Sequence, residues 1–219
     1  MEKVYHPTIS EQLFERFCLE MSIPFNRILE DKVQTPDYDI LLDQHHVVVE
    51  IKQFDINDED QKIIEELNQY GIVSYERNYV NRVRNKIQSA KSQLRFRAQH
   101  DHPALLVLYD NVSLRDLNAT DIMQAMYGEE IYTIGFSKDW EVLSINGKFG
   151  KNKKFTKTQN TIFSAIAVLE MVDINLNLSV FHNYYSRRPI NPDWIRAKNI
   201  KHFAIDPNSR KGLLEWVEI

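Results

Sequence analysis

Residues 36–52, which read PDYDILLDQHHVVVEIK, decide the fold of this chain. Apolar and polar side chains alternate on either side of a four-residue connection, a pattern typical of two strands joined by a hairpin. Successive side chains of a strand point to opposite faces, so Asp37 shares a face with Asp39, and Glu50 shares a face with Lys52. The sequence therefore predicts an antiparallel hairpin that carries acids and one lysine on a single face.

Two strand registers are compatible with the four-residue connection. A turn centred on Asp43 and Gln44 places Asp37 opposite Glu50, whereas a turn one residue later places Asp37 opposite Lys52. Like charges that face one another destabilise a sheet, and a bound cation removes that cost. Hard oxygen ligands suit Mg²⁺, or Mn²⁺ as a substitute, and a nearby lysine can act on an attacking water. The alternative is a solvent-facing hairpin whose charged groups are simply hydrated.

The composition is that of an ordinary globular protein. With 219 residues, of which 43% are hydrophobic and 26% charged, the chain is expected to form a single domain over residues 1–219. Cys18 is the single cysteine, which excludes an internal disulfide and is typical of a reducing compartment, so a cytoplasmic location is expected. No apolar run is long enough to cross a bilayer, so no membrane partner is expected. The net charge of −4 leaves any nucleic-acid binding to local basic patches.

Basic residues are concentrated in two parts of the chain. Residues 148–157 are rich in lysine, and a solvated loop is the favoured interpretation there. Residues 79–99 have apolar side chains at helical spacing, which predicts a long amphipathic helix. The polar face of that helix carries side chains that could contact phosphates: Arg82, Lys86, Gln93 and Arg97. A face that serves only solubility is an equally good interpretation.

The remaining pattern predicts an α/β protein with a central mixed β-sheet flanked by helices. A helix capped by Ser10 begins at Glu11 and ends before Pro24, and an exposed helix or excursion covers the acidic residues 55–66. The C-terminal half is expected to extend the sheet, with a further helix over residues 159–171. Strands are expected at 27–29, 36–42, 47–52, 104–109, 131–136, 141–145, 178–181, 202–205 and 213–219.

The order helix, hairpin, helix and buried strand resembles the PD-(D/E)xK nuclease superfamily, which has the restriction-endonuclease-like fold. The motif residues are Asp37, which follows a proline, and Glu50-Ile51-Lys52, at a separation of 50 − 37 = 13 residues. The resemblance implies a catalytic core at about residues 8–110. It also implies that Asp37 and Glu50 hold a metal ion with help from the Ile51 carbonyl, and that Lys52 acts on the water.

The resemblance also implies a glutamate on the first helix. Glu11 is the better match, and Glu15, one turn later, is its rival. Two positions depart from the family pattern: Ser22 stands where relatives often have glycine, and Asp39 offers a second possible acid ligand. In relatives the long helix often lends a polar side chain to the edge of the site, which suggests three candidates here: Lys86, Gln88 or Gln93.

These observations lead to an expected function. The chain is expected to be a Mg²⁺-dependent nuclease that hydrolyses phosphodiester bonds, with DNA favoured as substrate. The alternative is a catalytically inactive restriction-endonuclease-like domain that binds nucleic acid or a protein partner. A homodimer is compatible with either function.

Overall fold

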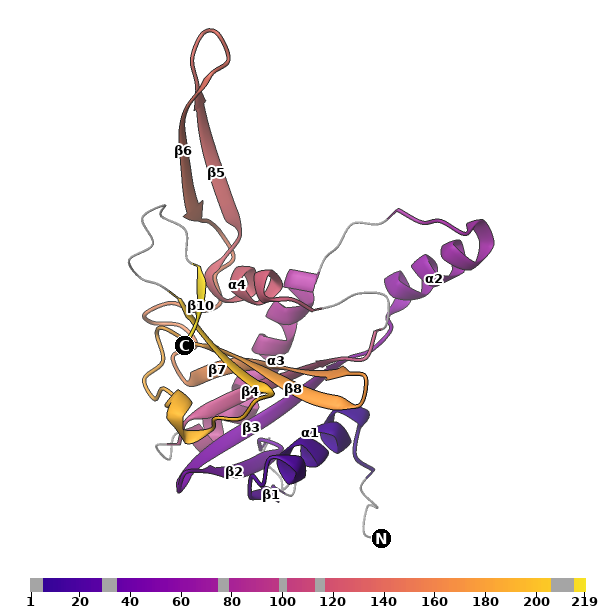
Figure 1. Ribbon diagram of the computed structural model, residues 1–219, viewed down its shortest axis with the longest axis vertical. Helices are drawn as coiled ribbons and strands as arrows, with labels where there is room; N and C mark the ends of the chain where they lie inside the picture. Colours follow the sequence, from indigo (N-terminus) through magenta and orange to yellow (C-terminus); the bar gives the residue numbers. More distant parts are fainter. Residues whose placement is uncertain (1–5, 29–34, 75–78, 99–101, 113–116, 206–214) are drawn as a thin grey trace.

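The computed structural model describes residues 6–28, 35–74, 79–98, 102–112, 117–205 and 215–219. Its centre is a mixed sheet in the order β1-β2-β3-β4-β7-β8-β9-β10 (Figure 1). Strands β3, β4 and β7 run parallel, and strands from the second half of the chain continue the sheet beyond β4. The strands are β1 (Phe25–Arg27), β2 (Tyr38–Leu42), β3 (His45–Phe54), β4 (Ala104–Asp110), β7 (Phe163–Val172), β8 (Asn175–His182), β9 (Ile200–Ile205) and β10 (Trp216–Glu218). The predicted α/β class with a central mixed sheet is confirmed.

Helices cover both faces of the sheet. Helix α1 (Ile9–Glu20) packs on one face, and α3 (Tyr79–Ala98) and α4 (Ala119–Tyr127) pack on the other (Figure 1). Helix α2 (Asp58–Tyr70) extends outward from the end of β3. The predicted long helix and the acidic helix are therefore confirmed. None of the described helices combines the length and the apolar character needed to cross a bilayer.

The sheet separates two hydrophobic cores because successive residues of its central strands face opposite sides. Val48 and Leu106 belong to the core under α3, whereas Val49 and Leu105 belong to the core under α1. A parallel strand covered on both faces is expected to be apolar throughout, and β4 follows this rule, with only its last residue less than buried. Glu50 lies in the same layer as Val48, so its carboxylate faces α3 from within the sheet.

Two further elements lie outside the central sheet. Strands β5 (Glu130–Phe136) and β6 (Val142–Phe149) form a separate two-stranded sheet, which projects from the body as a long arm (Figure 1). A 3₁₀ turn (Pro192–Trp194) precedes β9. Both arm strands were predicted from the sequence, although their direction away from the body was not.

Three local predictions are wrong. Residues 163–172 form strand β7 and not a helix, because a short run of apolar side chains buried on both faces looks alike in either state. Helix α1 is capped by Thr8 and not Ser10, since Thr8 and Glu11 form a reciprocal capping box. The first strand begins at Phe25, two residues before the predicted position. Helix α4 was not predicted, and the strand expected at 213–219 begins in residues outside the described part of the chain.

The end of α1 explains the position where glycine was expected. Ser22 follows the helix with a φ of 55°, in the left-handed region that glycine adopts most readily. The amides of Ser22 and Ile23 donate to the carbonyls of Leu19 and Cys18, which closes the helix. Serine therefore adopts here the backbone conformation for which glycine is the usual residue.

Candidate active site

The turn between β2 and β3 sets the geometry of the site. Asp43 and Gln44 both have positive φ, as required at the two central positions of a tight hairpin turn. Tyr38 consequently pairs with Val49, and continuing that register places Asp37 opposite Glu50. The first of the two predicted registers is the one observed.

Glu50 is the most deeply buried acid of this hairpin, with 0% of its surface exposed. Neither of its carboxylate oxygens has a hydrogen-bond partner of regular geometry among the described residues. Burial, followed by repulsion from Asp37, raises the pKa of Glu50 from 4.5 to about 8, against the opposing effect of Lys52. The fold therefore holds a carboxylate in an environment that disfavours its charge.

Asp37 lies just before β2 and is tied to the next strand. Its Oδ2 accepts a hydrogen bond of 2.7 Å from the backbone N–H of Ile51. Burial raises the pKa of Asp37 to about 6, although the Ile51 amide and Lys52 counteract this effect. The N–H and C=O of a strand residue point to the same side, so the Ile51 carbonyl also faces the edge where Asp37 lies. That placement is compatible with the predicted ligand role of the carbonyl.

Lys52 joins the acid pair to helix α3. Its Nζ lies 2.6 Å from Oε1 of Glu50 and donates a 2.9 Å hydrogen bond to Oε1 of Gln93. One side chain is thus held between a buried carboxylate and a neutral amide, with about a fifth of its surface exposed. This geometry fixes the ammonium beside the two acids.

The two candidate glutamates of α1 have different surroundings. The carboxylate of Glu11 caps its own helix through Thr8, forms an ion pair with Arg27, and acts on the pKa of Asp37. Glu15 instead accepts a 2.7 Å hydrogen bond from the hydroxyl of Tyr38. The structure therefore brings Glu11 toward the acid pair, whereas it directs Glu15 to a residue on the other face of the hairpin.

The other candidates on the hairpin have partners of their own. Asp39 shares the face of Asp37, but its carboxylate contacts Nδ1 of His46 at 3.0 Å. The ring of His45 stacks on Trp194 with 4.0 Å between the ring centroids. Both histidines therefore contribute to contacts within the hairpin or to its packing. Asp39 takes no part in the contacts that join Asp37, Glu50 and Lys52.

The four residues of α3 that were predicted to contact nucleic acid lie in different environments. Gln93 binds Lys52, and Lys86 is half-buried beside Lys52, with its Nζ 5.5 Å from the Phe54 ring centroid. Burial and the neighbouring cations lower the pKa of Lys86. Gln88 is exposed, and the side chain of Arg97 lies outside the described part of the chain. The part of α3 that faces the site therefore carries a positive charge that is partly removed from water.

Arg82 has a structural environment that the sequence analysis did not foresee. Its guanidinium pairs with the carboxylate of Asp60 at 2.8 Å and donates to the carbonyl of Asp55. It also lies over the rings of Phe54 and Tyr79. Since the Asp60 side chain is only 1% exposed, Arg82 joins α2 to α3 and has limited freedom to reach a phosphate.

Replacing Arg82 with alanine should therefore reduce stability more than nucleic-acid affinity. Removing one partner of a buried ion pair leaves the other charge uncompensated, which is expected to cost ~2–4 kcal/mol in the free energy of unfolding. Thermal melts and DNA-binding titrations of Arg82→Ala would be compared with Arg95→Ala, an exposed cation on the same helix. Unchanged stability together with weaker DNA binding would restore the predicted contact role of Arg82.

Two residues of the site were missed in the sequence. Arg27 contacts both Glu11 and Glu15 and acts on the pKa of Asp37. Gln53 accepts a 2.9 Å hydrogen bond from the backbone N–H of Ser10, which fixes the start of α1 against β3. An isolated arginine such as Arg27 gives little local signal, and Gln53 could be inferred only from its position beside Lys52.

The side chains of the site supply some of the oxygen ligands that a hard divalent cation requires. Among the residues that the structure describes, no three acidic, histidine or cysteine side chains are grouped as a ready metal centre. Asp37 and Glu50 provide two carboxylates with raised pKa values, and the second oxygen of Glu50 is buried without a hydrogen bond of regular geometry, although the backbone amide of Asp37 acts to lower the pKa of Glu50. A cation between them would relieve the repulsion and satisfy that oxygen.

These pKa values predict a pH-dependent response to magnesium. Folded-state pKa values of about 6 and about 8 lie above the ordinary values, so the folded protein retains protons that the unfolded chain releases. The free energy of unfolding of the metal-free protein should therefore fall as the pH rises through this range. At high pH, fewer protons compete with Mg²⁺ for the two carboxylates. The Mg²⁺-induced rise in Tm should be larger at about pH 9 than at about pH 6. Equal rises in melts at the two pH values would contradict the assignment.

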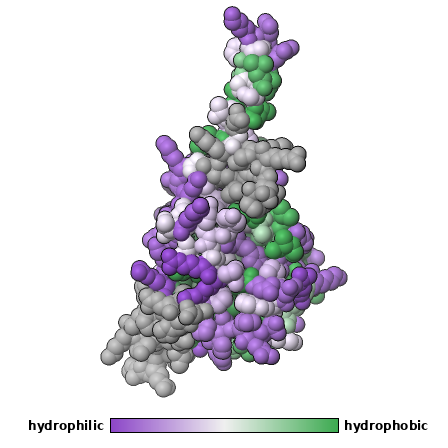
Figure 2. Space-filling model, turned by 90° about the vertical axis from the view of Figure 1, so that its left-hand side faces the viewer, coloured by the Kyte–Doolittle hydropathy of each residue, from purple (hydrophilic) through white to green (hydrophobic). Residues whose placement is uncertain are grey.

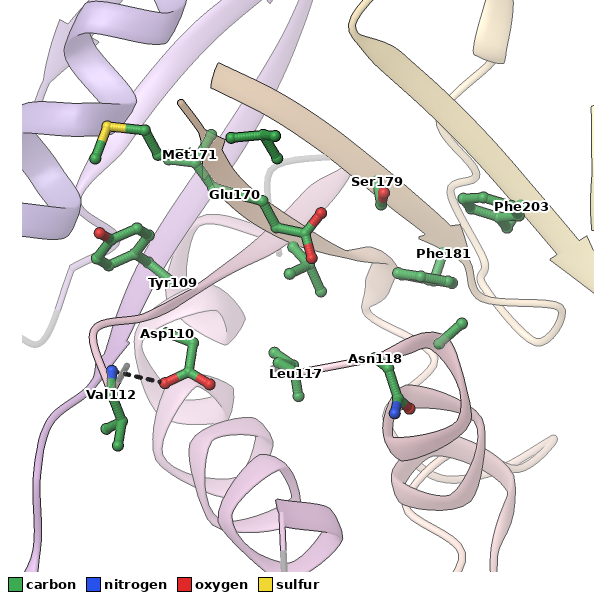
Figure 3. Close-up of a pocket in the computed structure, with 14 residues that line it drawn as sticks. Tyr109, Asp110, Val112, Leu117, Asn118, Glu170, Met171, Ser179, Phe181 and Phe203 are labelled. Atoms are coloured by element: carbon green, nitrogen blue, oxygen red, sulfur yellow. Dashed lines mark hydrogen bonds between the residues drawn. The ribbon is translucent and has the colours of Figure 1, made fainter. Parts of the chain in front are cut away.

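A groove lies at the end of the central strands, away from these residues. It encloses about 580 Å³, and Asp110 and Glu170 direct carboxylates toward it from β4 and β7 (Figure 3). Asp110 accepts a 3.0 Å hydrogen bond from the amide of Val112, and burial raises the pKa of its carboxyl. None of the predicted ligands lines this groove.

No protein-family model, curated protein or solved structure matches this chain. The function therefore has to be argued from the geometry of the described residues.

Proposed function

We propose that this protein is a magnesium-dependent nuclease that hydrolyses phosphodiester bonds in DNA, on a restriction-endonuclease-like fold. The observation that carries the proposal is the fully buried carboxylate of Glu50, which faces Asp37 and contacts Lys52 at 2.6 Å. Two acids and a lysine assembled inside a sheet destabilise the protein unless they serve a ligand or a reaction. A divalent cation and a water molecule satisfy all three groups.

Each residue has a distinct part in the proposed reaction. Asp37 and Glu50 hold the cation, the Ile51 carbonyl adds a neutral oxygen, and Glu11 completes the site directly or through water. The cation supplies Lewis acidity to the phosphate oxygens. Lys52 orients the water that attacks phosphorus in line with the departing oxygen, and Gln93 holds Lys52 in place.

The proposed substrate follows from the cations beside the site. Lys86, which belongs to α3, lies beside Lys52. Arg27 lies next to α1, where it pairs with Glu11. Phosphate groups are the substrate chemistry that such cations attract, even though the whole chain is acidic. DNA is the favoured nucleic acid, and RNA is the comparison substrate.

One observation favours a second candidate, a non-catalytic binding domain. The chain itself neutralises two of the acids, because Lys52 pairs with Glu50 and Arg27 pairs with Glu11. An inactive domain would keep these ion pairs closed and would show no response to metal. The two functions therefore differ in their dependence on Mg²⁺.

Cleavage of supercoiled plasmid tests the proposal directly. The purified protein is expected to convert supercoiled DNA to nicked or linear forms with Mg²⁺ or Mn²⁺, and to leave it intact with EDTA. Single-stranded DNA and RNA in the same buffers would define the substrate. Binding of DNA without cleavage under every metal condition would favour the inactive domain.

A further inference from the structure

The projecting hairpin of β5 and β6 exposes large apolar side chains that the fold does not cover. Neither hydrophobic core of the described residues includes a residue of this hairpin. Trp140, at its tip, is 82% exposed. Figure 2 shows hydrophobic residues along the arm. Besides Ile131, which is 37% exposed, the exposed apolar side chains are Tyr132, Ile134, Phe136, Trp140, Val142, Leu143 and Ile145.

Strand pairing places most of these side chains on one face, and Leu143 lies in a bulge of β6. Ile134 pairs with Ile145, and Phe136 pairs with Val142. The rings of Phe136 and Trp140 are 6.0 Å apart between centroids, which brings the tip onto the same face. Near the tip the opposite face is small and polar, since a Cβ on Gly135 would lie 2.7 Å from Oγ of Ser144 and Thr133 is exposed beside it, whereas Ile131 lies on this face nearer the base. The hairpin is therefore amphipathic across its two faces.

The middle of this face, from Tyr132 to Phe136 and from Val142 to Ile145, carries no charged side chain, whereas the turn at the tip carries Lys138, Asp139 and Glu141, which are exposed. At the base of the arm, Glu130 accepts a hydrogen bond from the Tyr132 hydroxyl. The middle of the described face therefore offers a phosphate no cation. A suitable occupant is apolar and uncharged, and a two-stranded hairpin is only marginally stable without such a cover.

We propose that the apolar face of this hairpin binds the same face of a second copy of the chain. A self-complementary apolar face brings no like charges together across a two-fold axis. Seven large side chains, each about half exposed or more, offer on the order of 800 Å² per copy, the area that each partner of a stable interface typically buries. The central row of the face, formed by Ile134 and Ile145, then lies nearest the axis.

Two adjacent substitutions on β5 test this interface by mass. Ile134→Asp puts a carboxylate on the apolar face, whereas Thr133→Asp puts the same group on the opposite face. Light scattering should give twice 25.9 kDa for the wild type and Thr133→Asp, but 25.9 kDa for Ile134→Asp. The thermal unfolding of the body should be unchanged, because the hairpin lies outside both cores. A monomeric wild type, a dimeric Ile134→Asp or a monomeric Thr133→Asp would overturn the proposal.

Disulfide trapping provides a second measurement that does not destabilise the interface. Cys18 is fully buried and burial raises its pKa to about 12, so it does not react. Under mild oxidation Ile134→Cys should give a crosslinked band at twice 25.9 kDa, and Thr133→Cys should stay at 25.9 kDa. A symmetric face-to-face contact is ruled out if the two variants crosslink equally. It is also ruled out if the wild-type protein assembles only with a different protein.

Discussion

Replacing Glu50 with glutamine is expected to abolish magnesium-dependent cleavage, by ~10³-fold or more, while leaving the protein folded. The amide keeps the size of the side chain but removes the charge that holds the cation. Because burial and Asp37 disfavour that charge, the metal-free variant should also melt higher than the wild type above about pH 8, by ~2–4 °C for each kcal/mol regained. Its Tm should rise little when Mg²⁺ is added.

A matched control separates this effect from a general change in charge. Glu66→Gln removes one carboxylate from the exposed face of α2, so its cleavage rate and its magnesium response should equal those of the wild type. The assignment of Glu50 as a ligand fails if Mg²⁺ stabilises Glu50→Gln as much as the wild type. It also fails if Glu66→Gln loses activity to the same extent.

Replacing Lys52 with alanine should slow cleavage by ~10²-fold or more without removing the metal site. Lys52 contacts Glu50 and Gln93, and it lowers the pKa of both acids. Without this cation beside the acids, the magnesium-induced rise in Tm should persist or increase. This result differs from that of Glu50→Gln, in which activity and the metal response are lost together.

Lys62→Ala, an exposed lysine on α2, is the control for Lys52→Ala. Single-turnover cleavage, DNA affinity and thermal melts of both variants would separate chemistry from binding and folding. If Lys52→Ala melts much earlier but cleaves normally per folded molecule, Lys52 is structural.

The alternation of residues 36–52 was sufficient to predict the hairpin and the shared face of its charges. Side-chain direction in a strand is fixed by a period of two residues, so the face of Glu50 and Lys52 does not depend on distant contacts. The register did require the structure, because either of two turn positions fitted the connection. Positive φ at Asp43 and Gln44 selected one of them.

Other features depend on contacts that the sequence does not display. Strand β7 has the composition of a buried helix, and only its pairing with β4 and β8 shows that it is a strand. Arg82 lay on the expected polar face, but pairing with Asp60 gives it a structural role. Arg27 contacts the acids of α1 from a different strand, and no local pattern marks such a contact.

The central claim is that Asp37 and Glu50 together bind a divalent cation. Crystals grown with Mn²⁺ and measured for anomalous scattering test it most directly, since the position of the metal is then observed independently of activity. A manganese peak between the two carboxylates, with bonds of ~2.1 Å and Lys52 displaced from Glu50, is the expected result. Crystals with Mn²⁺ present but no peak there, in which Lys52 still contacts Glu50, would contradict the account.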